Sequence, residues 1–121
     1  MKRLKKQANN QEDMIFDAIN SLDIFQDLSC KHFYELTRYL LRRNIINNNM
    51  IDMPLGEFTD CIYDEVANTD EYNGFKEEIL ENFKNAGGTE EQKEDLFYEF
   101  EKQYFGNIQE ILSDIVDEEN M

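Results

Sequence analysis

The chain has 121 residues, of which 40% are hydrophobic and 32% charged, and its formal net charge is −15. This size and apolar content suit one folded domain, which we expect to span residues 1–121, and they argue against a disordered chain. No apolar run approaches the roughly 18 residues of a transmembrane helix, and the basic N-terminus lacks the apolar stretch of a secretory signal.

The charge is divided unevenly along the chain. Residues 1–43 contain eight Lys or Arg and six Asp or Glu, a net of +2, whereas residues 44–121 contain four and twenty-one, a net of −17. Residues 1–10 form a basic arm, and residues 117–121 form an acidic tail that we expect to fray. Most of the surface should therefore repel nucleic acid and anionic membranes and attract basic protein surfaces.

In chain order, apolar residues recur with the period of amphipathic helices. The predicted helices cover residues 11–23, 29–43, 54–67, 74–85, 89–105 and 107–116. On the second of these, apolar residues occupy one arc of about 160°, and the opposite side carries a basic patch of Lys31, Arg38 and Arg42.

Local signals mark several of the predicted helix ends. Gly87 and Gly88 should end the fourth helix, and Thr89 with Gln92 is a capping box that should begin the fifth. Gly106 should end the fifth helix. The connector over residues 44–53 carries apolar residues that we expect to fill a gap between helices.

These patterns predict an all-α fold, a compact single-domain bundle of five or six short amphipathic helices. No stretch alternates with period two over the length of a strand. The predicted core consists of Leu22, Phe33, Leu36, Leu40, Phe58, Ile62, Ile79, Phe83, Phe97, Phe100, Ile111, Leu112 and Ile115.

No motif in the chain indicates catalysis, a cofactor or a metal. Cys30 and His32 lie two residues apart, so on a helix their side chains diverge and cannot share a metal ion. The segment 69–80 resembles a calcium loop only in its centre, because Thr69 and Leu80 replace the required first and twelfth ligands. We therefore expect a non-enzymatic protein, with both cysteines reduced.

A partner-binding face is predicted on the fourth and fifth helices, where exposed aromatics lie among carboxylates. Its residues are Glu77, Glu81, Glu91, Glu94, Tyr98, Glu101 and Phe105. An alternative is that Tyr98 and Phe105 pack beneath the basic arm or a neighbouring helix.

Two functions fit this composition. In the first, the acidic helices bind a basic protein surface, as small acidic phage or mobile-element inhibitors do when they block the nucleic-acid-binding groove of a host or defence protein. In the second, the chain is a structural or assembly subunit of a phage particle, with basic arm and acidic body pairing between subunits. The expected location is accordingly the cytoplasm of a bacterial host or the virion, and the sequence leaves the oligomeric state open.

Overall fold

The computed structural model describes residues 12–26 and 31–119, and within these ranges the chain forms helices and no strands. The helices are residues 12–20, α2 (Asp23–Gln26), α3 (Lys31–Arg42), the 3₁₀ helix η1 (Asn48–Met50), α4 (Leu55–Ala67), α5 (Asp70–Asn85), the 3₁₀ helix η2 (Glu90–Gln92) and α6 (Lys93–Glu119). The predicted all-α fold is confirmed. The basic arm and Cys30 lie outside the described residues.

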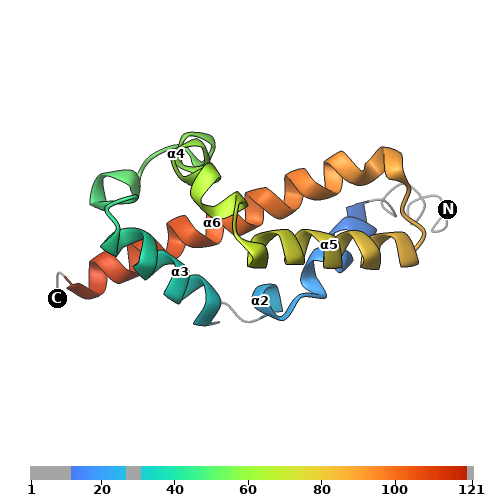
Figure 1. Cartoon of the computed structure of the whole chain (residues 1–121), viewed down its shortest axis with the longest axis horizontal. Coiled ribbons are helices and arrows are strands. Elements are labelled where there is room, and N and C mark those ends of the chain that lie inside the picture. The colour runs from blue at the N-terminus through green and yellow to red at the C-terminus, as the bar shows by residue number, and fades with distance from the viewer. Residues whose placement is uncertain (1–11, 27–30, 120–121) are drawn as a thin grey trace, which may run out of the picture.

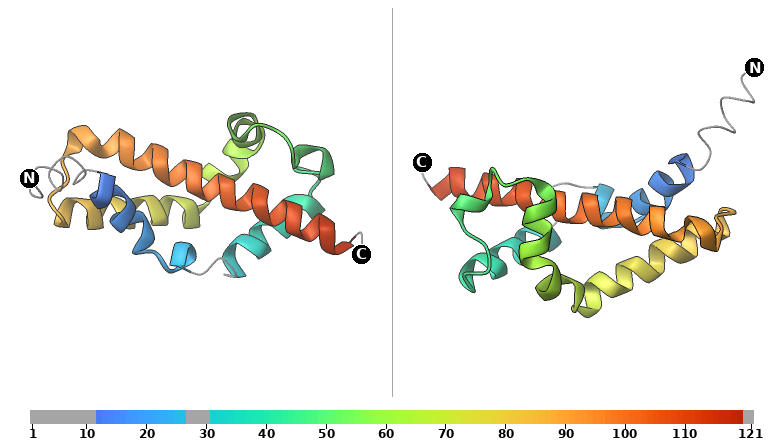
Figure 2. Two further views of the ribbon diagram at one scale, coloured as in Figure 1. Left: turned by 180° about the vertical axis from the view of Figure 1, so that it is seen from behind. Right: turned by 90° about the horizontal axis from the view of Figure 1, so that it is seen from above.

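The long helix α6 organises the molecule. It has 27 residues, which corresponds to a length of about 40 Å. Helix α5 runs back along α6, whereas α3 and α4 pack toward the C-terminal part of α6 (Figure 1). The helix over residues 12–20 lies beside the α5–α6 pair (Figure 2), where the Asn82 side chain donates a hydrogen bond to Ser21 Oγ over 2.7 Å.

Several helix boundaries differ from the prediction. The first helix, predicted over residues 11–23, ends at residue 20, and the separate helix α2 follows after a turn. Helix α6 continues through Gly106 and reaches Glu119, so the predicted helix end at Gly106 is wrong, and residues 117–119 are helical. Helix α5 begins at Asp70 instead of residue 74, because Thr69 caps it by accepting a hydrogen bond from the Tyr72 backbone N–H over 3.2 Å. The description of all helices as short is therefore corrected for α6.

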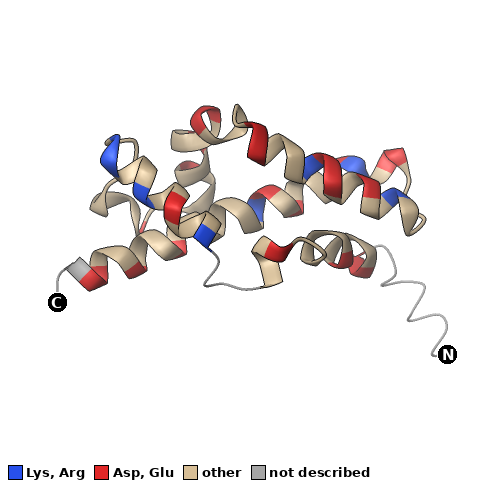
Figure 3. Ribbon diagram, turned by 60° about the horizontal axis from the view of Figure 1, so that its bottom comes forward, with Lys and Arg blue, Asp and Glu red and all other residues tan. Residues whose placement is uncertain are grey.

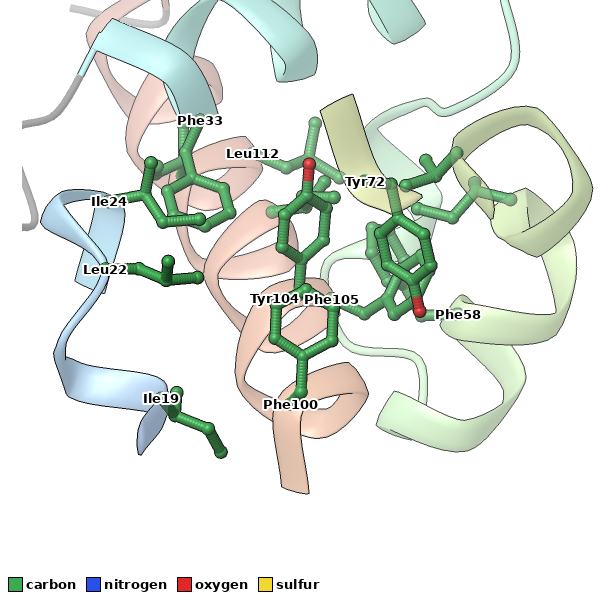
Figure 4. Packing of buried hydrophobic residues seen from close by; sticks show 14 of the residues in the cluster. Ile19, Leu22, Ile24, Phe33, Phe58, Tyr72, Phe100, Tyr104, Phe105 and Leu112 are labelled. Atoms are coloured by element: carbon green, nitrogen blue, oxygen red, sulfur yellow. The ribbon is translucent and has the colours of Figure 1, made fainter. Parts of the chain in front are cut away.

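The largest fully buried side chains of the core are aromatic (Figure 4). The predicted core residues are buried except Leu36 and Phe97, which are partly buried against it. Tyr104 lies at the centre, with ring centroids 5.1 Å from Phe33 and 5.5 Å from Phe100. The core thus joins α3 to α6 through aromatic contacts.

The turns behave as the sequence predicts. Gly87 has a φ of 103°, which favours glycine, and a Cβ at Gly88 would collide with the Phe83 ring. The Thr89 backbone N–H donates to the Gln92 side chain over 3.1 Å. In the connector over residues 44–53, Ile46 and Met50 are buried, as expected.

Candidate functional site

The carboxylates of the predicted partner-binding face lie on the surface, but they do not form one uninterrupted acidic area. Glu77, Glu81, Glu91 and Glu94 are exposed. Glu101 is only partly exposed, and its Oε1 lies 3.8 Å from the ammonium of Lys76. Glu101 is therefore already compensated within the chain.

Lysines pair with some of the carboxylates on this α5–α6 face, and Figure 3 shows basic positions interspersed with acidic ones there. Lys84 lies 2.8 Å from Glu90, and Lys102 lies 3.0 Å from Glu99. The hydrogen bond from Lys84 lowers the pKa of Glu90, and the hydrogen bond to Glu99 raises the pKa of Lys102. Because these pairs are exposed, they shape the charge pattern more than they stabilise the fold.

Phe105 is fully buried, so the surface exposure on which its predicted role in partner binding depended is wrong. In the middle of α6 two sides of the helix are covered, one by α3 and one by α4 and α5. The Phe105 ring faces the second side, 6.0 Å from the Tyr63 ring and 5.9 Å from the Tyr72 ring. The alternative that Phe105 packs against a neighbouring helix is correct.

Tyr98 is 64% exposed, in agreement with its predicted position on the surface. It lies beside a groove of about 260 Å³ between α4 and α6, which Leu55, Thr59 and Asp60 also line. The ammonium of Lys102 lies 5.4 Å from the centre of the Tyr98 ring. The structure therefore associates this aromatic with α4, a helix that the sequence analysis did not include in the binding face.

Helix α4 carries a row of exposed carboxylates without ion pairs. Its Glu57, Asp60 and Asp64 are exposed and form no ion pair with any described residue. Residues 44–75 contain seven Asp or Glu and no Lys or Arg. Residues three and four apart on a helix lie on one side, so these three carboxylates form a row over about 10 Å.

The predicted basic patch lies on α3. Lys31, Arg38 and Arg42 are all exposed, and the Arg38 guanidinium carbon lies 5.7 Å from the centre of the Tyr34 ring. The patch is therefore available on the surface, at a different helix from the acidic row.

His32 forms a chain of polar contacts that the sequence analysis missed. Its Nε2 lies 2.6 Å from the hydroxyl of Tyr104, and its Nδ1 lies 3.5 Å from Oε2 of Glu71. The carboxylate favours a proton on Nδ1, which leaves Nε2 to accept the hydrogen bond from the Tyr104 O–H. This chain connects α3, α5 and α6.

The surroundings of His32 favour a neutral imidazole. Its ring centroid lies 5.1 Å from that of Phe75 and 5.2 Å from that of Phe33. Burial lowers the pKa of His32, and the charges of Glu71 and Glu35 oppose this effect. Burial also raises the pKa of Tyr104, so its hydroxyl stays protonated as a donor. No local spacing pointed to this contact, because His32 and Tyr104 are 72 residues apart.

A pocket of about 330 Å³ opens beside His32. Helix α3 contributes His32, Glu35, Leu36 and Tyr39, α4 contributes Glu65, and α5 contributes Glu71. The position of His32 near Tyr39 on the polar flank of α3 is the one feature of the pocket that helical geometry could have indicated.

Within the described residues no group of His, Cys, Asp or Glu side chains is arranged to hold a metal ion. No described helix combines the length and apolarity that crossing a membrane requires. Cys61 is exposed on α4 and is a free thiol.

Comparison of the chain with known protein families, curated proteins and solved structures finds no match.

Proposed function

We propose that this protein is a non-enzymatic acidic module that binds a basic, nucleic-acid-binding surface of a partner protein. The observation that carries the proposal is the row of Glu57, Asp60 and Asp64 on α4, which are exposed and form no ion pair with a described residue. Carboxylates on successive turns of a helix lie about 6 Å apart, a spacing similar to that of phosphates along a nucleic-acid strand.

Tyr98 supplies the second part of the proposed interface. Interfaces depend on a few large anchors, and tyrosine is enriched among them. Tyr98 lies at the groove that Asp60 also lines, so an aromatic anchor and a carboxylate lie together. A basic partner would gain apolar contact from the first and charge complementarity from the second.

The test uses tagged protein and a bacterial lysate first enriched on heparin for nucleic-acid-binding proteins. The proposal predicts that a basic protein is retained, that excess duplex DNA displaces it, and that neutralising the α4 row (Glu57→Gln, Asp60→Asn, Asp64→Asn) abolishes its retention. A matched variant carries Glu110→Gln, Asp114→Asn and Asp117→Asn on α6, which removes the same charge from exposed positions.

Retention that DNA does not affect, or that both charge variants reduce equally, would contradict the proposal. The structural-subunit alternative predicts a different result. In that case sedimentation would show the purified protein assembling by itself into salt-sensitive oligomers, and no basic partner would be needed.

A further inference from the structure

The pocket beside His32 has a strongly negative lining. Three carboxylates reach it from three helices, Glu35 from α3, Glu65 from α4 and Glu71 from α5, and no described Lys or Arg lines it. Glu35 and Glu65 form no ion pair with a described residue, and Glu71 has only His32 as a partner. The pocket therefore favours a cation.

The walls of the pocket select among cations. Leu36 offers apolar surface, and the ring of Tyr39 is 42% exposed. Arginine fits both, because its methylene stem packs on apolar groups and its planar guanidinium stacks on aromatic rings while donating hydrogen bonds to carboxylates. The ring of Tyr39 already accepts one guanidinium, since the Arg43 guanidinium carbon lies 5.7 Å from its centre.

One wall of the pocket, formed by His32, is held in place before any ligand arrives. The imidazole of His32 is fixed by Tyr104 over 2.6 Å and by the rings of Phe33 and Phe75, and its side chain is only 15% exposed. A site that is already formed loses less entropy when it binds.

We propose that this pocket receives an arginine side chain of the basic partner. The inference rests on the proposed function and specifies the partner chemistry, an arginine flanked by other basic residues. It also assigns direct contacts with the partner to Glu35, Glu65 and Glu71, which are not part of the α4 row.

The chain contains one histidine, so the Hε1 proton of the His32 imidazole gives one NMR signal, the His32 signal, that reports on the pocket. The probe is a capped hexa-arginine peptide, titrated at about 0.15 M salt, where charges beyond about 8 Å are largely screened. We expect the His32 signal to shift on binding and the pKa of His32 to fall, because a nearby cation disfavours the imidazolium. Hexalysine should bind more weakly than hexa-arginine.

Two variants that remove the same number of charges distinguish binding in the pocket from nonspecific attraction to the acidic chain. Glu35→Gln with Glu65→Gln should weaken the affinity for hexa-arginine about five- to ten-fold, as expected for two partly solvated ion pairs. Glu12→Gln with Asp13→Asn, exposed at the start of the helix over residues 12–20 and far from α3 (Figure 1), should change it less than about two-fold.

Several results would overturn the inference. If the peptide binds but the His32 signal stays fixed, or both variants weaken binding equally, the arginine pocket is refuted while the acidic-module function stands. If argininamide alone binds as tightly as the peptide, the pocket takes a small free cation instead of a partner side chain. If hexa-arginine does not bind at all, the pocket and the acidic-module function both fail.

Discussion

Gly106 gives the sharpest test of the fold. The sequence pattern predicts that replacing it with alanine destabilises the protein, whereas the structure predicts that this replacement stabilises it. In the structure Gly106 lies inside α6, and a Cβ added there would meet Leu55 Cδ2 at 3.8 Å, an ordinary van der Waals contact. Glycine is about 0.8–1.0 kcal/mol less favourable than alanine inside a helix. Gly106→Ala should therefore raise the free energy of unfolding by about 1 kcal/mol.

This change is large enough to measure by calorimetry or by circular dichroism during heating. The entropy of unfolding is about 2.1 cal/mol/K per residue near 60 °C, which gives about 0.25 kcal/mol/K for a chain of this length. A gain of about 1 kcal/mol then corresponds to a Tm increase of about 4 °C.

Two further glycines calibrate the result. Gly74→Ala inside α5, where a Cβ would meet no atom within 4 Å, should stabilise the protein by a similar amount. Gly87→Ala should lower Tm by about 4–8 °C, because the φ of 103° disfavours a side chain. If Gly106→Ala lowers Tm as Gly87→Ala does, α6 ends at Gly106 and the continuous helix is refuted.

Four other predictions concern burial, pH and salt. Phe105→Ala should lower the free energy of unfolding by about 3–5 kcal/mol in urea denaturation, whereas Tyr98→Ser should change it by less than about 0.5 kcal/mol; equal losses would contradict the assigned burial. Burial lowers the pKa of His32, so a fall in pH through 6.5 protonates the unfolded chain first and removes stability. His32→Gln should lose this part of the pH dependence of Tm. If Tm changes with pH by the same amount in the variant and in the unmodified protein, the role of His32 in this pH dependence is refuted. Thr37→Val should raise stability by up to about 1 kcal/mol, because the buried Thr37 hydroxyl has no hydrogen-bond partner among the described residues; a clear loss would show that the hydroxyl is bonded. Added NaCl should raise Tm by screening repulsion between carboxylates, and a steady decrease would indicate that attractive ion pairs dominate.

The helical period was sufficient to predict the class of fold and most of the core, because an amphipathic helix must bury its apolar side. Phe33 and Leu40 on α3 and Ile111 and Leu112 on α6 are buried as predicted. Gly106 was wrongly predicted to end the helix, because a glycine ends a helix only where the residues after it do not continue the packing of that helix. Here the apolar stripe continues on both sides of Gly106, and that packing outweighs the cost of glycine.

The site was harder to predict because its residues come together only in three dimensions. Phe105 appeared exposed because one helix was assumed to bury one side, whereas α6 is covered on two sides. The contact between His32 and Tyr104 joins residues far apart in the sequence, and only the packing of α3 on α6 creates it. The acidity of α4 was visible in the sequence, but only the structure shows that its Glu57, Asp60 and Asp64 form no ion pair with a described residue.

The most direct test of the proposed function is a competition measured on the partner itself. The partner recovered from the heparin-enriched lysate is bound to a fluorescently labelled DNA duplex, and fluorescence anisotropy is followed as this protein is added. The proposal predicts that anisotropy falls to the value of free DNA, and that the Glu57→Gln, Asp60→Asn, Asp64→Asn variant leaves it high. An anisotropy that stays the same or increases, because the protein and the DNA occupy the partner together, would contradict the proposal that the acidic surface takes the place of nucleic acid.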